Sequence, residues 1–266
     1  MTDISVIVPT YNSSLFISKT LKSIINQTLK PYEVIIIDDG STDNTKEKIQ
    51  SIIIQNKNIN IKLISGLHAG PGSARNIGIK SAKSKWIAFL DSDDLWFKEK
   101  LKIVSKSIKE NVDYTFFCHN EKTFQFGKPA IVLDYSKKYN PKKKLSKQLY
   151  KNNLFSTSAV VCLRDDLIKA GGFDENLSSA QDYDLWLKMS QHIKPFFIKK
   201  VLGVYTIRDG NITSTNHFKK LINIMTIMIR HKSKGNMFLF FVKISFYFIL
   251  IPLVLSIKKI IYRFKR

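Results

Sequence analysis

Short apolar runs rich in β-branched residues alternate with longer segments of helical periodicity over roughly the first 90 residues. Residues 4–9, 33–37 and 59–65 are predicted to be strands, because each is a compact apolar run bounded by polar residues. The segments between them repeat apolar residues on one helical face: Ile17, Leu21, Ile24 and Ile25 in the first, and Ile49, Ile52 and Ile53 in the second. This order is typical of right-handed crossovers in an α/β protein, with a mostly parallel sheet flanked by helices.

A fourth apolar run, residues 86–90, ends directly in Asp91, Ser92, Asp93 and Asp94. If the extended geometry persists, Asp91 and Asp93 face the same side of the sheet. Two carboxylates about 4 Å apart repel by about 4 kcal/mol at an effective dielectric of about 20, so a counter-charge is expected. Mg2+ or Mn2+ would supply it and would be shared with substrate phosphates. The alternative is an ordinary strand end whose Asp/Ser turn caps the next helix.

Polar residues follow three of the predicted strands, and the loop 68–72 leads into a helix start at 73–78. Ligands of open parallel sheets bind beyond the carboxyl ends of the strands. The residues predicted to lie there are Thr10, Tyr11, Asp38, Asp39, Arg75, Asp91 and Asp93. Their convergence favours a ligand site. No Gly-x-Gly-x-x-Gly follows the first strand and the sequence has no Gly-Lys-Ser/Thr loop, so dinucleotide and P-loop binding lose their main support.

The pattern is looser after residue 110. Residues 112–118 and 155–161 are predicted strands, and 171–175 is a predicted turn. Residues 180–187 open an amphipathic helix. The Lys-rich run 136–147 indicates an exposed loop or helix start, which is either a solvated face or a contact with phosphate or membrane.

The chain has 266 residues, a formal net charge of +22 and a pI near 9.8, which indicate an anionic partner. Nucleic acid, acidic lipid headgroups and phosphorylated substrates all qualify. A nucleic-acid-binding protein is disfavoured because the aromatic residues are not interleaved with the basic runs. Cys118 and Cys162 lie in apolar surroundings and are predicted to be reduced, buried thiols in a cytosolic compartment. The early first strand predicts no cleaved signal peptide.

Residues 237–257 form an apolar stretch of 21 residues, interrupted by Lys243 and Pro252. At 1.5 Å per residue such a helix could just cross a hydrocarbon core of about 30 Å. Basic residues flank both ends, so an in-plane or re-entrant anchor at an anionic, cytoplasmic membrane face fits better than a span. The alternative is a helical pair that packs on the rest of the protein or mediates homo-oligomers.

Six stretches together resemble the inverting glycosyltransferases of family 2, which have the GT-A fold. They occur in the family's order, cover roughly residues 4 to 190, and are residues 5–12, 37–43, 72–78, 89–94, 171–175 and 181–186. Each stretch is weak alone, and the set is specific. The resemblance implies a nucleotide-sugar-binding half at 1–110, an acceptor-binding half at 111–215 and a membrane-associated helical segment at 216–266.

The resemblance also implies roles for the donor half. Pro9, Thr10 and Tyr11 are similar to the uridine-binding loop, where an aromatic ring can stack on the base while Asp39 accepts a hydrogen bond from the uracil N–H. Arg75 matches a position near the diphosphate. The alternatives are an ordinary helix-start aromatic for Tyr11 and a helix-surface arginine paired with a carboxylate for Arg75.

The Asp-x-Asp signature of the family matches Asp91, expected near the ribose, and Asp93, expected to be the main metal ligand. Both belong to the implied site for Mn2+ or Mg2+, and the ligand types suit both ions. Asp94 is expected to cap the next helix. Arg208, which resembles part of a downstream motif with Tyr205, is expected to contact the diphosphate, although the His often found beside this motif is missing.

Asp182 is similar to the family's catalytic base, which takes the proton of the attacking acceptor hydroxyl. Gln181 departs from the family's usual Glu, and Asp184 lies on a different helical face. The alternative for both aspartates is a carboxylate placed at the positive end of the helix dipole. His68, His119 and His217 show no metal-ligand spacing and are expected to be loop or surface residues.

The resemblance implies transfer of a sugar from a UDP-sugar donor, with inversion, to a lipid-linked glycan acceptor. We therefore expect an enzyme of bacterial surface-polysaccharide synthesis, such as one that extends an O-antigen (lipopolysaccharide) unit on undecaprenyl diphosphate at the cytoplasmic face of the inner membrane. A sugar-phosphate nucleotidyltransferase is the alternative enzyme, but residues 9–12 do not resemble its Gly-rich, Arg- and Lys-containing loop.

Overall fold

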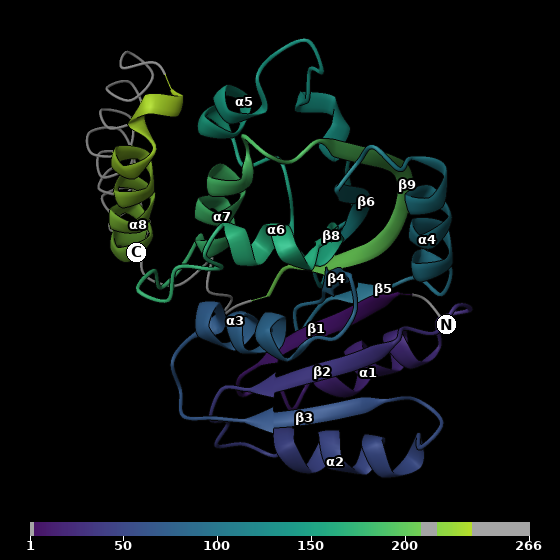
Figure 1. Ribbon diagram of the computed structural model, residues 1–266. Coiled ribbons are helices and arrows are strands. Elements are labelled where there is room, and N and C mark those ends of the chain that lie inside the picture. Colours follow the sequence, from purple (N-terminus) through teal and green to yellow (C-terminus); the bar gives the residue numbers. More distant parts are fainter. Residues whose placement is uncertain (1–2, 209–216, 236–266) are drawn as a thin grey trace.

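One nine-stranded sheet runs through residues 3–208 and 217–235, the part of the chain that the computed structural model describes (Figure 1). Its order is β3-β2-β1-β4-β8-β6-β9-β5, with β7 paired to β6. The strands are β1 (Ile4–Thr10), β2 (Glu33–Asp38), β3 (Ile61–Ser65), β4 (Trp86–Phe89), β5 (Leu95–Trp96), β6 (Phe116–Phe124), β7 (Val132–Leu133), β8 (Val160–Leu163) and β9 (Pro195–Thr206).

Helices cover both faces of this sheet (Figure 1). One face carries α1 (Ile17–Ile25), α2 (Thr45–Gln55) and α4 (Lys100–Glu110). The opposite face carries α3 (Pro71–Ser81), α5 (Leu145–Lys151), α6 (Arg164–Lys169), α7 (Gln181–Met189) and α8 (His217–Arg230). Short 3-10 turns lie at Tyr135–Lys138, Thr157–Ala159 and Lys232–Lys234.

The first strand shows how the sequence builds two cores. Val6 and Val8 pack against the α1, α2 and α4 face, whereas Ile7 packs on the α3 side, and all three side chains are fully buried. Strands buried on both faces need continuous apolar runs, which is why the strands of the first half stand out in the sequence. The sheet therefore separates two cores.

The sheet is parallel in its first half and mixed in its second. Strands β3, β2, β1 and β4 run parallel to one another, as predicted. Strand β8 then pairs antiparallel with both β4 and β6, and β5 pairs antiparallel with β9. The expectation of a mostly parallel sheet is thus correct for the four β3-β2-β1-β4 strands and wrong for the sheet as a whole.

Element boundaries in the second half differ from the prediction. The strand expected at 112–118 begins at Phe116 and continues to Phe124, and Val112 lies exposed in the preceding turn. The run 155–161 contains a 3-10 turn before β8 begins. Strand β9, which the pattern does not predict, carries Lys199 and Lys200 at a register shift opposite β6, so its apolar alternation is interrupted.

Two further expectations concern burial and the membrane. Cys118 and Cys162 are free and buried, as predicted. Among the described helices, none has the length and apolar character needed to cross a membrane. The apolar segment 237–257 lies outside the described residues. The two predicted halves share one sheet through the β4–β8 pairing, and their boundaries stay a prediction.

Candidate active site

A cavity of about 790 Å³ opens beyond the carboxyl ends of β1, β2 and β4. This is the edge at which the sequence predicts a ligand site. The cavity lining includes every residue predicted to bind the donor or a metal: Pro9, Thr10, Tyr11, Asp39, Arg75, Asp91, Asp93 and Arg208. Asp38, also predicted at this edge, is fully buried beside the cavity and accepts a hydrogen bond from the Ser41 N–H instead.

The loop after β1 presents Tyr11 to the cavity. The Tyr11 ring is 42% exposed and stacks on the ring of His68, with centroids 4.0 Å apart and planes 22° apart. A planar base can therefore stack on the free face of Tyr11 or take the place of His68. The Thr10 hydroxyl is buried and has no hydrogen-bond partner within the described chain. An unpartnered hydroxyl in a cavity wall suits a polar ligand atom.

Asp39 holds the loop at residues 68–70, which lines the cavity, in place. Its carboxylate accepts hydrogen bonds from the backbone N–H groups of Ala69 at 2.8 Å and Gly70 at 2.9 Å, and lies 2.8 Å from Nδ1 of His68. The following residue, Gly40, has φ +76°, and a Cβ there would lie 2.9 Å from the His68 backbone nitrogen. Asp39 thus orders the loop that carries His68, a role beyond its predicted contact with uracil.

The carboxylates after β4 are neutralised by two arginines. Nη2 of Arg75 lies 2.6 Å from Oδ1 of Asp91, and Nε of Arg208 lies 2.8 Å from Oδ2 of Asp93. The chain turns between Asp91 and Asp94, where the Asp94 N–H donates to the Asp91 carbonyl at 3.0 Å. The extended geometry, on which a shared orientation of Asp91 and Asp93 depended, does not persist through this stretch, and a turn separates the two carboxylates. The predicted counter-charge is present as arginine.

Arg75 and Arg208 both retain capacity for an anionic ligand. Arg75 is 7% exposed, and its Nε has no partner among the described residues. Its guanidinium lies 5.3 Å from the Phe173 ring centroid, and that of Arg208 lies 4.6 Å from the Phe16 ring centroid. Rings on these faces fix the planar groups, so their edges with the N–H donors are available for bidentate contact with phosphate oxygens.

The chemistry and exposure of Asp91 and Asp93 suit a divalent ion that is shared with a ligand. Within the described residues, no group of three or more His, Cys, Asp or Glu side chains is arranged to hold a metal. The side chains of Asp91 and Asp93 are 33% and 16% exposed and line the cavity. Burial and the charge of Asp91 raise the pKa of Asp93, opposed by Arg208. Two such carboxylates suit Mg2+ or Mn2+ when a diphosphate and water complete the coordination.

Asp94 does not cap the next helix, contrary to expectation. It is buried, and its carboxylate accepts hydrogen bonds from the Ser158 hydroxyl at 2.6 Å and the Thr206 N–H at 2.8 Å. The Ser158 hydroxyl oxygen in turn accepts from the Asp91 N–H at 3.1 Å. Asp94 therefore ties the carboxylate turn to β9, the strand that leads to Arg208. Burial raises the pKa of Asp94 well above its usual range, and the negative charges of nearby carboxylates add to the increase.

Asp182 lies in the first turn of α7 and is not among the residues that line the cavity. Its side chain is partly buried, and Oδ2 accepts a hydrogen bond from the Asn153 amide at 3.1 Å. Burial raises the pKa of Asp182, while the nearby charge of Arg75 and the Tyr183 N–H lower it. Asp182 is thus close enough to the cavity to interact electrostatically with Arg75, and its raised pKa makes it a stronger proton acceptor than an exposed aspartate.

The start of α7 is also conformationally unusual. Ala180, directly before the helix, has φ 59° and ψ 25°, in the left-handed region that non-glycine residues seldom adopt. Such backbone strain persists only where surrounding contacts hold it. Here the Gln181 amide donates to the Leu177 carbonyl at 2.6 Å. Gln181, which departs from the family's usual Glu, therefore has a structural contact.

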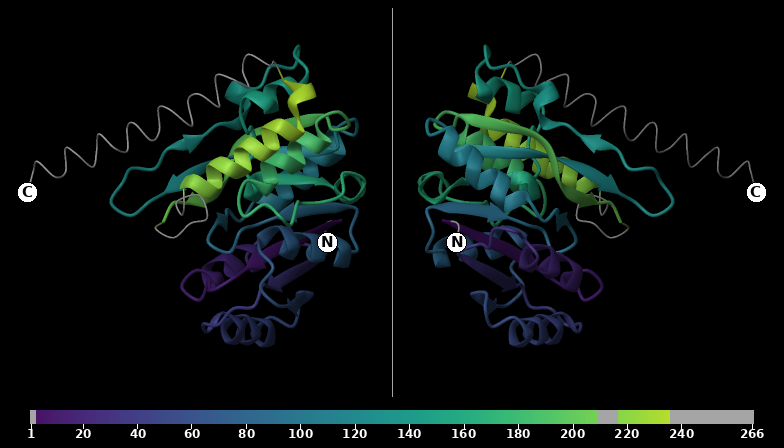
Figure 2. Two further views of the ribbon diagram at one scale, coloured as in Figure 1. Left: turned by 90° about the vertical axis from the view of Figure 1, so that its left-hand side faces the viewer. Right: turned by 90° about the vertical axis from the view of Figure 1, so that its right-hand side faces the viewer.

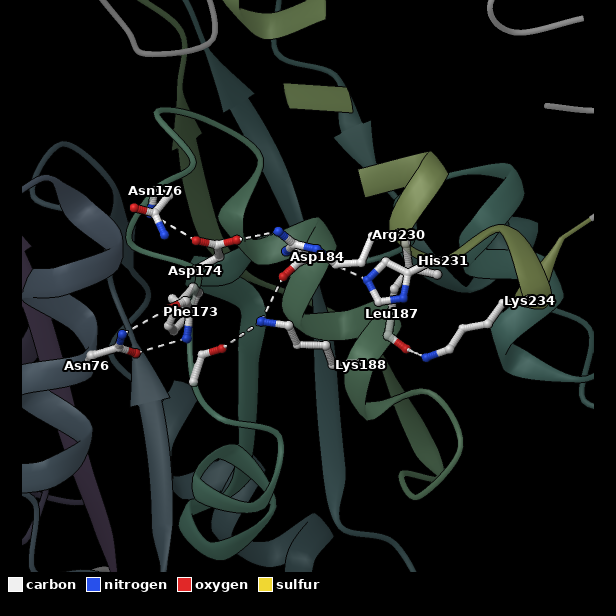
Figure 3. A network of polar contacts seen from close by, with 11 residues as sticks. Asn76, Phe173, Asp174, Asn176, Asp184, Leu187, Lys188, Arg230, His231 and Lys234 are labelled. Atoms are coloured by element: carbon white, nitrogen blue, oxygen red, sulfur yellow. Dashed lines mark hydrogen bonds and ion pairs between the residues drawn. The ribbon is translucent and has the colours of Figure 1, made fainter. Parts of the chain in front are cut away.

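A polar network fixes the other side of α7 (Figure 3). Asp184 is fully buried, forms ion pairs with Lys188 at 2.8 Å and Arg230 at 2.9 Å, and is hydrogen-bonded to Nε2 of His231 at 2.9 Å. Despite its burial, the hydrogen bonds and charges of these partners lower the pKa of Asp184 to about 2. Arg230 also pairs with Asp174 at 2.7 Å. Asp184 therefore joins α7 to α8 and already has two cationic partners. Asp182, in contrast, forms no ion pair within the described residues and accepts a hydrogen bond from Asn153.

The network continues to the donor side through α3 (Figure 3). Asn76, next to Arg75, accepts a hydrogen bond from the Phe173 N–H at 2.8 Å and donates to the Phe173 carbonyl at 2.9 Å. Helix α3 itself lies very close to the sheet, since a Cβ on Gly78 would lie 2.5 Å from Cγ2 of Ile7 and 2.9 Å from Cδ1 of Ile37. These contacts fix the helix that presents Arg75 to the cavity.

One of the histidines, His119, differs from the expectation of loop or surface residues. His119 is fully buried, and its Nδ1 lies 2.9 Å from the Asn120 carbonyl. Glu121 and Lys100 are fully buried close by, and Nζ of Lys100 lies 3.2 Å above the Trp96 ring. His68 is a loop residue, as expected, but its stacking on Tyr11 makes it part of the cavity.

Several site residues could not be found from the sequence alone. Ser158 and Asn153 belong to segments without a recognisable motif and reach the site through folding over long sequence distances. His68 offers one local signal, because it precedes the Ala-Gly-Pro-Gly loop that opens α3. The cavity is also lined by residues 175–178, which follow the predicted turn at 171–175.

This arrangement defines an α/β protein with a polar cavity at the carboxyl edge of a parallel half-sheet. A profile of the family described as "Glycosyl transferase family 2" matches residues 5–171. The chain belongs to this family, and its fold is the GT-A type. The predicted resemblance is thereby confirmed.

Among solved structures, S. aureus TarS 1-349 in complex with UDP-GlcNAc is similar, with a TM-score of 0.72 and 27% identity over 88% of this chain and 66% of that one. WfgD of Escherichia coli, described as "UDP-Glc:alpha-D-GlcNAc-diphosphoundecaprenol beta-1,3-glucosyltransferase", is 31% identical over 82% of each chain. An uncharacterised glycosyltransferase of Rickettsia bellii is 32% identical over 86% of this chain and 32% of its own length. The chain spans about a third of the length of this protein and of the matching Rickettsia conorii and Rickettsia felis proteins.

Proposed function

We propose that this protein is an inverting glycosyltransferase that moves a sugar from a UDP-sugar to a hydroxyl group of a lipid-linked glycan. The observation that carries the proposal is the convergence of the donor-type residues on one cavity, with Asp182 beside it. The name of WfgD includes a UDP-sugar donor and a diphosphoundecaprenol acceptor, and TarS was crystallised with UDP-GlcNAc. Both names support the proposal for this chain.

The donor would bind with its base at Tyr11 and its diphosphate between Arg75 and Arg208. Tyr11 offers an exposed ring face, and Thr10 offers an unpartnered hydroxyl. The two arginines now pair with Asp91 and Asp93. A bound diphosphate would compete for the same guanidinium donors, so donor binding is expected to free the carboxylates.

Asp91 and Asp93 would then hold Mn2+ or Mg2+, which neutralises charge on the diphosphate leaving group when it is bound. Arg75 contributes to the same stabilisation, because its Nη2, which now pairs with Asp91, can donate to a phosphate oxygen instead. Release of the carboxylates from their arginines links donor binding to metal binding. We therefore propose that each ligand strengthens the binding of the other.

Asp182 would accept the proton of the acceptor hydroxyl as its oxygen attacks the anomeric carbon. The bond from that carbon to the diphosphate breaks on the opposite face, so one displacement inverts the anomeric centre. Burial raises the pKa of Asp182 and Asn153 orients its carboxylate. Both features favour proton transfer at neutral pH, where the carboxylate must be ionised before it can act as a base.

The net charge of +22 supports attachment to an anionic membrane, where a lipid-linked acceptor would be found. We accordingly propose that the protein works at the cytoplasmic face of the bacterial inner membrane in surface-polysaccharide synthesis, such as that of O-antigen. The role of residues 237–257 as an in-plane anchor, and a homo-oligomeric state, remain part of this proposal.

The test combines binding and transfer. UDP binding is measured by calorimetry with and without Mn2+ on the wild type and on Asp93→Ala. We expect metal-enhanced binding that the substitution abolishes. Asp182→Asn should retain UDP binding and lose transfer to a diphosphoundecaprenol-linked sugar by about 100- to 10,000-fold.

Asp165→Asn, at an exposed carboxylate on α6, is the matched control and should change neither quantity. Absence of UDP binding in both metal conditions would refute the donor proposal. Unchanged transfer in Asp182→Asn would refute the role of the base alone, and binding of DNA at physiological salt would favour a nucleic-acid partner.

A further inference from the structure

The hairpin formed by β6 and β7 projects from the body of the molecule (Figure 2). Its two strands pair at Glu121 with Leu133 and at Lys122 with Val132, and the Thr123 N–H donates to the Ile131 carbonyl at 2.8 Å. Strand β6 also pairs with β9 as far as Phe124, whereas β7 lies at the edge of the sheet. The far end of this hairpin is therefore a surface whose composition can indicate a partner.

The far end is apolar. Four side chains, here called the apolar tip, are exposed: Phe126 by 94%, Ile131 by 63%, Phe124 by 57% and Val132 by 57%. The turn is ordered by the Lys128 N–H, which donates to the Gln125 carbonyl at 3.1 Å, and by Gly127 at φ +71°. Four large apolar groups exposed together on one projecting hairpin are unusual for a surface that contacts only water.

Lysines follow the apolar tip in the sequence. Lys128 lies in the turn, and the exposed lysines that follow the hairpin are Lys137, Lys138, Lys142, Lys143, Lys144 and Lys147. Between residues 121 and 151 the sequence has nine lysines, and its only acidic residues are Glu121 and Asp134. Glu121 is fully buried, so Asp134 is the only one that offsets this positive surface.

We propose that the β6–β7 hairpin inserts its apolar tip into an anionic lipid membrane while Lys128 in its turn and the lysines that follow the hairpin in the sequence contact the headgroups. Apolar side chains that enter the acyl boundary, combined with cations at the headgroup level, are the physical requirements for interfacial binding. A convex, projecting tip fits a lipid surface better than it fits the groove of a protein partner.

The hairpin is connected directly to the cavity. The Ile207 N–H donates to the Phe124 carbonyl at 2.8 Å, and Thr206, which pairs with Phe124, lines the cavity. Insertion of the tip would therefore hold the cavity beside the bilayer. This consequence rests on the proposed lipid-linked acceptor, whereas insertion itself can be tested without any transfer assay.

The experiment places a fluorescent reporter at the apolar tip of the 266-residue chain. Phe126→Trp is mixed with vesicles of 30% phosphatidylglycerol and 70% phosphatidylcholine in which the phosphatidylcholine carries brominated acyl chains. Trp86, Trp96 and Trp186 are buried and give a constant background. Ile54→Trp is the matched control, because Ile54 is 67% exposed on α2, far from the hairpin (Figure 1).

We expect a blue shift and strong quenching for Phe126→Trp and neither change for Ile54→Trp. Replacement of both Phe126 and Ile131 by Ser should lower partition to these vesicles by about tenfold or more, without changing the thermal midpoint. Replacement of Lys142, Lys143 and Lys144 by Gln should weaken binding to anionic vesicles and leave binding to neutral vesicles unchanged.

An unquenched Phe126→Trp in vesicle-bound protein would overturn the proposal, since another segment would then hold the membrane. A blue shift that depends on protein concentration and appears without vesicles would also overturn it, in favour of contact with a second copy of the chain. Quenching reports on the hairpin alone, so its failure is distinguishable from a failure of glycosyl transfer.

Discussion

Replacing the buried Glu121 by Gln should change how the stability of the protein depends on pH. One carboxylate oxygen of Glu121 accepts a hydrogen bond from Tyr135 at 2.7 Å, and the other has no partner within the described residues. Burial raises the pKa of Glu121 from 4.5 to about 7. Between these values the folded state binds more protons than the unfolded state, so the contribution of Glu121 to stability is present below pH 4.5 and is lost as pH rises through 7.

The neighbouring His119 acts in the opposite direction. Burial, with the charge of Lys100, lowers the pKa of His119 from 6.5 to about 3. Its contribution is present above pH 6.5 and is lost as pH falls through 3. Between pH 4.5 and 6.5 each residue changes the free energy of unfolding by about 2 kcal/mol, with opposite signs. The two residues thus cancel over this range in the wild type.

Glu121→Gln removes one side of this balance. The free energy of unfolding of the variant, relative to the wild type, should rise by about 2 kcal/mol from pH 4.5 to pH 6.5. The measurement is urea unfolding followed by tryptophan fluorescence at several pH values. Glu110→Gln, at an exposed carboxylate at the end of α4, is the control and should run parallel to the wild type. Parallel profiles for Glu121→Gln and the wild type would refute the reasoning, because Glu121 would then titrate alike in both states.

Three further predictions concern the supports of the site. Asp184→Asn should lower the free energy of unfolding by about 2 kcal/mol at neutral pH. In the wild type this contribution to stability should be present above pH 3.8 and be lost as pH falls through about 2. Acid titration followed by circular dichroism measures this loss. Gly78→Ala should destabilise by about 1–3 kcal/mol in urea unfolding, because its methyl group would overlap Ile7, and a neutral result would contradict the close packing. Ser158→Ala should lower the free energy of unfolding by about 1–3 kcal/mol, because the buried Asp94 carboxylate loses a hydrogen-bond donor. It should also weaken UDP binding in calorimetry. Wild-type UDP affinity in this variant would show that Ser158 does not support the turn that carries Asp91 and Asp93.

The parallel half of the fold could be predicted because its signals are local. Strands buried on both faces give unbroken apolar runs, and polar residues at their ends mark the ligand edge. The approximate strand positions and the cavity residues Tyr11, Asp39, Asp91 and Asp93 followed from these two facts. The family resemblance added Arg208, which lies 115 residues from its partner Asp93.

The remaining features depend on contacts that no local pattern contains. Asp94 has the sequence context of a helix cap, but tertiary hydrogen bonds to Ser158 and Thr206 determine its position. Lys100, His119 and Glu121 would be assigned to the surface by residue type, yet all three are fully buried. Their burial and their electrostatic influence on one another become visible only when β6 and α4 are placed in space.

The change from parallel to antiparallel pairing between β4 and β8 separates the donor-type residues from the surroundings of Asp182 along the chain. Nearly all the residues proposed to bind the donor precede this boundary, and Asp182 with its surroundings follows it. Among the residues proposed to bind the donor, only Arg208 follows β8, and it pairs with Asp93. Mutation of the segment after β8 could therefore alter the surroundings of Asp182 without changing most donor-type residues, provided that Arg208 and the other cavity-lining residues at 175–178 and 205–206 are kept.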